Sequence, residues 1–474
     1  MQTQTTNVEG ARDRAGSLNE LLRVSIPLVI SYSATALMHV VDRIFLSWHS
    51  VESMAASLPA GVLHWNLAAL AIGTVSYANA FIGQYVGARD ESRVGPVLWQ
   101  AIYLSFIGAI LMLAAVPFAP AVFSWIGHHE SVQPLEVRYY TIMSLGSVPL
   151  LLAHTLSCFY SGRGHTTTIM VVNMLGTLIN IVLDYLLIFG YGGFPRMGID
   201  GAAIATAISF SAIALMYVGH MALTQRRSPY CLWSGRRFDR ELFGRLIRFG
   251  LPSGVQQFLD IACWSTFIQL VGRLGKDELS ATGLAFNLNS LAFIPMMGMG
   301  IAVTALVGQR IGEARPHLAV RTTWLAFGVA MIYTVLLAAV YLFAPHVILK
   351  PYGITESQPG VEQLVLFLLK LMAVYSLFDA AAVIFSAATR GAGDTLFAML
   401  LSVSLGIVFL VLPTFVAAQY GREGFVYAWY AVAVFLFMSA VGFMARFQQG
   451  RWKSMRVIEH TAPELEAEPE PVLA

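Results

Sequence analysis

The chain has 474 residues, of which 57% are hydrophobic and only 12% are charged, and its mean hydropathy is +0.66. A soluble domain carries about 25% charged residues, so this composition argues against an ordinary soluble protein. The formal net charge of +2 is too small to indicate a nucleic-acid partner. Three cysteines without a CxxC spacing argue against a disulfide framework or a structural zinc site.

Long apolar runs separated by short polar breaks occupy most of the chain. A run of about 20 apolar residues is long enough to span a bilayer as a helix. The runs lie near residues 21–46, 57–82, 96–119, 136–160, 168–190, 199–223, 247–272, 280–305, 319–345, 362–388, 396–419 and 424–446. The sequence therefore predicts an all-α membrane protein with about twelve transmembrane helices.

Lys and Arg residues indicate the orientation of these helices. If the N-terminus is placed inside, most of the 29 basic residues fall in inner segments, among them Arg12, Arg163, Arg310 and Arg390. This asymmetry follows the positive-inside rule. We therefore expect a multi-pass protein of the cell inner membrane with both termini in the cytoplasm.

Residues 224–246 form the longest internal connector. Phe238, Leu242 and Leu246 recur there at helical spacing among several arginines. This pattern suits either a basic amphipathic helix on the inner membrane face or a solvated linker that runs into the next span. The polar stretch from about Gln448 to the C-terminus has the composition of a disordered tail.

The two halves of the chain repeat each other. Pro27 matches Pro252, Gly83-Gln-Tyr-Val-Gly-Ala88 matches Gly308-Gln-Arg-Ile-Gly-Glu313, and Arg163-Gly164 matches Arg390-Gly391, all in the same order. Six spans in each half give both halves the same orientation, so a pseudo-twofold axis along the membrane normal relates two six-helix lobes. The predicted organisation is a cytoplasmic tail, the N-terminal lobe, the connector, the C-terminal lobe and a second cytoplasmic tail, at residues 1–20, 21–223, 224–246, 247–446 and 447–474.

Ionisable residues inside spans are candidates for a functional site, because each costs roughly 2.5–3.5 kcal/mol to insert. In the first lobe, Asp42 and Asp184 have matched depth, and Asn180 lies four residues before Asp184 on the same helix face. Thr206 can add a hydroxyl. His39, one turn before Asp42, is either a proton relay or a buried histidine with a satisfied hydrogen bond.

The second lobe carries its own acids, Asp260 and Asp379, with Tyr375 one turn before Asp379. Carboxylate, amide and hydroxyl oxygens suit Na⁺, whereas a proton needs only a carboxylate in a suitable environment. Lys370 either neutralises a carboxylate or extends toward the outer interface. We expect two unequal acidic sites, one in each lobe.

These residues resemble the multidrug and toxic compound extrusion (MATE) family over nearly the whole chain except its tails. The first span, with Pro27 and Val41-Asp-Arg-Ile-Phe-Leu46, is similar to that family's first helix, and Asn180-Ile-Val-Leu-Asp184 is similar to the fifth helix of its DinF branch. Gly250-Leu-Pro-Ser-Gly-Val-Gln-Gln-Phe-Leu-Asp260 and Tyr375-Ser-Leu-Phe-Asp-Ala380 look like the seventh and tenth helices of the NorM branch. Gly283 stands where the family commonly has glutamine.

The resemblance implies a cation site in the first lobe at Asp42, Asn180, Asp184 and Thr206. It implies a cation or substrate site in the second lobe at Asp260, Asn287, Tyr375 and Asp379. The implied protein is a monomeric antiporter, not an enzyme, that exports organic compounds in exchange for H⁺ or Na⁺ and needs no other cofactor or metal. Its other partners are membrane lipids, with no nucleic acid. A flippase of a lipid-linked precursor is the alternative, although a pyrophosphate cargo calls for several cationic residues in the cavity.

Overall fold

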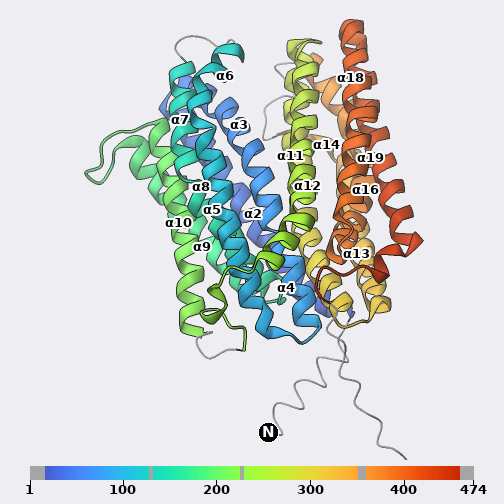
Figure 1. Cartoon of the computed structure of the whole chain (residues 1–474). Coiled ribbons are helices and arrows are strands. Elements are labelled where there is room, and N and C mark those ends of the chain that lie inside the picture. The colour runs from blue at the N-terminus through green and yellow to red at the C-terminus, as the bar shows by residue number, and fades with distance from the viewer. Residues whose placement is uncertain (1–15, 127–131, 225–228, 351–358, 460–474) are drawn as a thin grey trace, which may run out of the picture.

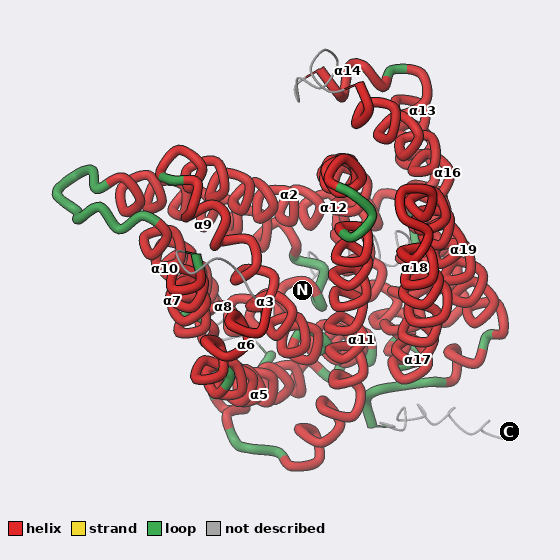
Figure 2. Tube along the Cα trace, turned by 90° about the horizontal axis from the view of Figure 1, so that it is seen from above, coloured by secondary structure: helices red, strands yellow, loops and turns green. Residues whose placement is uncertain are grey.

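The computed structural model describes residues 16–126, 132–224, 229–350 and 359–459, which form helices and connecting loops without a strand. Two groups of helices lie side by side, one from each half of the chain (Figures 1 and 2). Both termini of the described chain lie at the same end of the molecule (Figure 1), which is called the tail end below. The repeat seen in the sequence is therefore present as two lobes.

The N-terminal lobe is built from helices that run up and down in succession (Figure 1). Two of its predicted spans are broken: one is interrupted at Ser76–Tyr77, and another bends by 45° at Gly146. The helices are α2 (Leu18–His49), α3 (Val51–Val75), α4 (Ala78–Gly87), α5 (Val94–Ala114), α6 (Ala119–Ile126), α7 (Gln133–Leu145), α8 (Ser147–Ser161), α9 (Thr166–Phe189) and α10 (Ile199–Thr224).

The C-terminal lobe repeats this plan with longer helices. Its eleventh predicted span is irregular, because a π-helix (Gly406–Val411) separates α17 from α18. The helices are α11 (Arg240–Gly272), α12 (Lys276–Gly312), α13 (Pro316–Phe343), α14 (Pro345–Leu349), α16 (Pro359–Ala392), α17 (Thr395–Leu405), α18 (Leu412–Ala417) and α19 (Gly424–Gln449).

The span count agrees with the sequence once two features are considered. Among the described residues, nine helices are long and apolar enough to cross a membrane, or ten if the bent α7–α8 pair is one span. That count treats Thr395–Gln449 as one span. Within this stretch, however, α17 and α18 pack against α19, so the chain crosses twice. The count also omits α11. Adding α11 and separating α19 gives twelve.

Apolar side chains cover the outside of the helices. Leu215, Ile110 and Leu336 are among many large aliphatic residues that are exposed in the structure. Such residues cost free energy in water but not in a bilayer, whose hydrocarbon core is about 30 Å thick. The chain is a multi-pass membrane protein.

The lobes meet through two copies of the same glycine motif. A Cβ atom on Gly87 would lie 2.8 Å from the backbone carbonyl carbon of Gln309, and one on Gly312 would lie 2.8 Å from that of Gln84. Gln84 Nε2 donates to the carbonyl of Gly391 at 3.1 Å, and Gln309 Nε2 donates to that of Gly162 at 2.7 Å. The repeated motif therefore makes a pseudo-symmetric contact in which glycine lets the two backbones approach closely.

The connector and the C-terminal segment differ from their predictions. Residues 240–248 are the first turns of α11, with Asp239 as the N-cap and with Leu242 and Leu246 buried. They are therefore neither a separate amphipathic helix nor a solvated linker. The prediction of a disordered tail is wrong for Gly450–Glu459. This segment packs at the tail end, where Trp452 and Val457 are fully buried. Residues 460–474, and Arg12 and Arg14 in the other tail, lie outside the described residues.

Candidate cation site and lobe interface

Asp42, Asn180 and Asp184 come together inside the N-terminal lobe. Helix α2 carries Asp42 and α9 carries Asn180 and Asp184, and these two helices pack along each other. With its amide nitrogen toward the carboxylates, Asn180 donates to Asp42 Oδ1 at 2.9 Å and to Asp184 Oδ2 at 3.2 Å. All three side chains are buried, and Asn180 and Asp184 have no exposed surface. One amide thus bridges two carboxyl groups away from solvent.

Among the described residues, the ion-pair partner of these carboxyl groups is His39 rather than a lysine or arginine. Arg43, next to Asp42 in the sequence, is exposed, because adjacent residues point about 100° apart on a helix. Asp184 Oδ1 has no hydrogen-bond partner among the described residues. A buried, unpaired carboxylate is costly. The site therefore has the chemistry to take up one positive charge, either a proton shared between the carboxyl groups or a bound cation.

Of the two further residues that the sequence indicated, Thr206 on α10 forms no hydrogen bond with the cluster among the described residues, whereas His39 lies beside Asp42. The Thr206 hydroxyl is buried and donates to the Ala202 carbonyl at 3.0 Å, which leaves its oxygen lone pairs for an ion. His39 Nδ1 lies 3.8 Å from Asp42 Oδ2, and the His39 side chain is 31% exposed. His39 therefore connects Asp42 to a more accessible surface, as a relay requires, but this distance is longer than a hydrogen bond.

The sequence-based prediction did not include two residues near this site, Tyr139 and His64. Tyr139 on α7 is buried near both Asp42 and Asp184. His64 on α3 is fully buried, and neither of its ring nitrogens has a hydrogen-bond partner in the described part of the chain. His64 and His39 both pack edge-on against Trp65. A histidine inside an apolar run was the only available signal for His64.

The acids of the C-terminal lobe are more dispersed. Asp260 on α11 and Asp379 on α16 are each half-buried, and they have different neighbours: Arg390 acts on Asp260, whereas Tyr375 lies near Asp379. Lys370 is exposed on α16, which fits extension toward the interface rather than neutralisation of a buried acid. No group of three or more His, Cys, Asp or Glu side chains suited to a metal ion occurs within the described ranges.

The polar partner of Tyr375 is Asn289, not Asn287. Tyr375 Oη lies 3.4 Å from Asn289 Oδ1 and donates to it, whereas Asn287 is exposed and donates to Gly283 on its own helix at 2.9 Å. The two asparagines are separated by two residues and so point to different sides of α12. Asn287 therefore stays a prediction as a site residue, and Asn289 is the α12 residue that contacts Tyr375.

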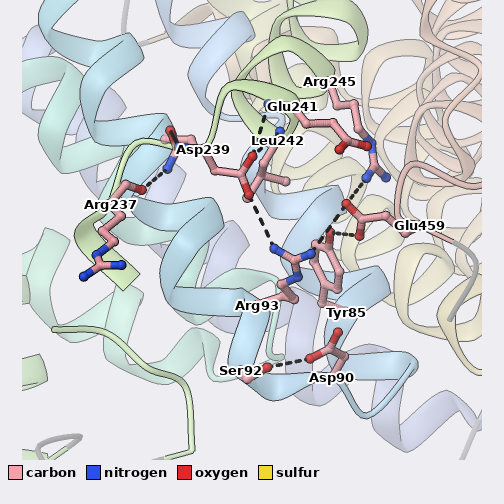
Figure 3. Close-up of polar contacts among 11 residues, drawn as sticks. Tyr85, Asp90, Ser92, Arg93, Arg237, Asp239, Glu241, Leu242, Arg245 and Glu459 are labelled. Carbon is pink, nitrogen blue, oxygen red and sulfur yellow. Dashed lines mark hydrogen bonds and ion pairs between the residues drawn. The ribbon is translucent and has the colours of Figure 1, made fainter. Parts of the chain in front are cut away.

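Ion pairs hold the C-terminal segment across the lobes at the tail end (Figure 3). Glu459 accepts from Tyr85 on α4 at 2.7 Å, forms an ion pair with Arg245 on α11, and lies 4.0 Å from Arg93. Arg93 also contacts Asp239 at 3.4 Å. Burial alone would raise the pKa of Glu459, but the Tyr85 hydrogen bond and the two arginines hold it below its usual value. The segment thus links both lobes through one carboxylate.

Twelve membrane spans within the described residues, arranged in two pseudo-symmetric lobes with buried acids inside, define a membrane transporter of the two-lobe type. The family model for MatE matches residues 27–186 and 252–415, which begin at the two prolines of the internal repeat. The chain therefore belongs to the MATE family.

Named relatives and solved structures agree with this family. The multidrug resistance protein PmpM of Pseudomonas aeruginosa is 29% identical over 406 residues, covering 83% of this chain and 82% of the relative. The probable multidrug resistance protein NorM of Thermotoga maritima is 24% identical, covering 93% and 94%. An outward-facing multidrug resistance MATE transporter superposes with a TM-score of 0.83 at 23% identity, covering 92% of this chain and 97% of that one. The likeness to this solved structure shows a shared fold.

Proposed function

We propose that this protein is a secondary antiporter that exports organic compounds, many of them cationic, in exchange for H⁺ or Na⁺ by alternating access. The observation that carries the proposal is the buried Asp42–Asn180–Asp184 cluster, whose carboxyl groups form no ion pair with a lysine or arginine among the described residues. A cluster that gains a cation in one state and loses it in another can couple ion movement to lobe movement. The family and the names of the relatives support multidrug efflux.

The proton is the coupling ion that we favour. Two carboxylates sharing one amide in a low-dielectric site cannot both stay ionised cheaply, so they are suited to carry one proton between them. The driving force is about 1.4 kcal/mol per pH unit, plus about 2.3 kcal/mol per charge per 100 mV of membrane potential. We expect the carrier to work as a monomer in the inner membrane, with the tail end in the cytoplasm.

The C-terminal lobe supplies the substrate side of this proposal. Asp260 and Asp379 are less deeply buried than Asp184, so an organic cation can reach them more easily. Exchange follows if cation binding in the N-terminal lobe and substrate binding in the C-terminal lobe favour different arrangements of the lobes. The contacts of Glu459 and of the glycine motifs at the tail end must then change during the cycle.

Reconstitution into proteoliposomes tests the export function. A fluorescent organic cation should accumulate against its gradient only when an H⁺ or Na⁺ gradient is imposed in the opposite direction. Asp42→Asn should abolish this accumulation. Movement of a lipid-linked pyrophosphate between leaflets, with no ion-driven accumulation of the dye, would favour the flippase alternative and contradict the proposal.

A further inference from the structure

Three exposed arginines lie at the tail end around the first turns of α11. Arg240 and Arg248 are on α11 itself, and Arg456 is on the C-terminal segment, residues 450–459. None of the three forms an ion pair within the described part of the chain. This set, which is called the arginine patch below, therefore offers its positive charge to a ligand from outside the chain.

The acids around the arginine patch are mostly engaged elsewhere. Asp239 accepts two backbone N–H groups at the start of α11 and contacts Arg93, and Glu459 pairs with Arg245 (Figure 3). Glu241 is the one other acid on the first turns of α11. Three arginines against one carboxylate leave this surface with a net positive charge.

Helix geometry places two of these arginines on one face of α11. Positions 240, 244 and 248 are four residues apart, so they point within about 80° of one another and span about 12 Å along the helix axis. Gly244 is exposed, and a Cβ atom there would meet nothing within 4 Å. The two guanidinium groups therefore have open space between them, in which one ligand can contact both.

The C-terminal segment brings the third arginine to the same place. A Cβ atom on Gly393, just before α17, would lie 3.9 Å from Phe249 Cε1 and 4.0 Å from the backbone carbonyl carbon of Arg456. The Arg248 guanidinium carbon lies 5.9 Å from the centre of the Phe249 ring. Arg248 and Arg456 thus lie near the same aromatic side chain, although they come from distant parts of the sequence.

Apolar surface begins directly beyond the arginine patch. Leu251, one turn after Arg248 on α11, is exposed, as are Leu396 and Leu400 in the first turns of α17, which packs against α11. Phe238, just before α11, is also exposed, as is typical of aromatic residues at a membrane–water interface. A ligand that matches both parts of this surface is negatively charged at one end and hydrocarbon at the other.

We propose that the arginine patch binds an anionic phospholipid from the membrane leaflet at the tail end, with the phosphate at the arginines and the acyl chains along α11 and α17. Clustered arginines at the end of a membrane span attract anionic headgroups. The exposed leucines distinguish a lipid from a soluble phosphate. The inference depends on the membrane location of the chain and not on the proposed export function, so a lipid-binding experiment tests it separately.

Native mass spectrometry of the purified full-length protein, with one lipid added at a time, tests the proposal. Dioleoylphosphatidylglycerol should bind at least about tenfold more tightly than dioleoylphosphatidylcholine, which has the same chains but no net charge. Glycerol phosphate should not displace the bound lipid, because it lacks the chains. These measurements use the unsubstituted protein, so they do not depend on the folding of a variant. Equal affinity for the two lipids, or displacement by glycerol phosphate, would overturn the assignment.

A matched control then locates the headgroup. The double variant Arg240→Gln and Arg248→Gln should reduce the preference for the anionic lipid to about threefold or less. Arg23→Gln should keep the preference: Arg23 matches Arg248 in the internal repeat and is exposed, but it lies beside α9, where Thr166 donates to its carbonyl at 3.5 Å. An undiminished preference in the double variant, or an equal loss in Arg23→Gln, would contradict the proposed site.

Discussion

In the N-terminal lobe, Asp42 and Asp184 share one buried amide, whereas in the C-terminal lobe Asp260 and Asp379 have different neighbours. The backbones of the two lobes nevertheless follow one plan and meet through the same glycine motif. A duplicated fold thus preserves the contacts that join its halves while its interior acids diverge. This division is what an exchanger needs if one lobe takes the ion and the other takes the substrate.

The largest effects are expected where the lobes are alike. Gly87→Ala and Gly312→Ala should each destabilise the protein by about 1–3 kcal/mol, because the new Cβ atom meets backbone rather than a movable side chain. Thermal unfolding of the purified protein measures this effect. Gly61→Ala and Gly328→Ala, one in each lobe with open space around the site, are the controls and should be neutral or slightly stabilising. Very unequal destabilisation by Gly87→Ala and Gly312→Ala would contradict a pseudo-symmetric interface.

The next effect concerns the acid of the C-terminal lobe. Asp379→Asn should weaken binding of an organic cation by about tenfold, since loss of one charge interaction of about 1.4 kcal/mol gives that factor. It should leave the identity of the coupling ion unchanged. Equilibrium binding of a fluorescent cation to the purified protein provides the measurement. Unchanged affinity would remove Asp379 from the substrate site.

A smaller effect distinguishes two asparagines on α12. Asn289→Ala should weaken binding of the same cation by about threefold, because it removes the partner of Tyr375 and so loosens the side chain beside Asp379. Asn287→Ala should bind as the unsubstituted protein does, since Asn287 donates to its own helix. Weaker binding by Asn287→Ala, with unchanged binding by Asn289→Ala, would instead favour Asn287, the residue that the sequence indicated.

The smallest effect is expected at the tail end, where the two lobes share Glu459. Glu459→Gln should lower stability at pH 7 by at most about 1 kcal/mol, because the carboxylate is partly solvated. The pKa of Glu459 lies below its ordinary value of 4.5, so its contribution is present above pH 4.5 and is lost as the pH falls through the lowered pKa. The difference in melting temperature between the two proteins should therefore vanish in acid.

Asp90→Asn is the control for this tail-end prediction. Asp90 lies near the same end and accepts from Ser92. Its substitution should leave stability unchanged at either pH. A difference between Glu459→Gln and the unsubstituted protein that grows as the pH falls would contradict the assigned contacts.

Much of this arrangement was predictable from periodicity and polarity. Apolar run length predicted the spans, and the shared depth of Asp42 and Asp184 predicted their meeting, because helix geometry fixes how far along the membrane a residue lies. The burial of Trp452 and Val457 was not predictable, since the hydropathy of a short polar segment does not show which helices it packs against. The choice between Asn287 and Asn289 depends on the rotation of α12, which packing determines and hydropathy does not.

The most direct test of the account is export by inside-out membrane vesicles under separately imposed H⁺ and Na⁺ gradients. We predict that an H⁺ gradient drives export in the unsubstituted protein, that Asp184→Asn loses this export, and that Asp379→Asn keeps it with a weaker apparent affinity for substrate. Asp184→Asn removes the like charge while keeping shape and hydrogen-bonding capacity, so loss of export reports on the shared proton. Export driven by Na⁺ and indifferent to pH in the unsubstituted protein, or full H⁺-driven export by Asp184→Asn, would contradict proton coupling at the Asp42–Asp184 pair.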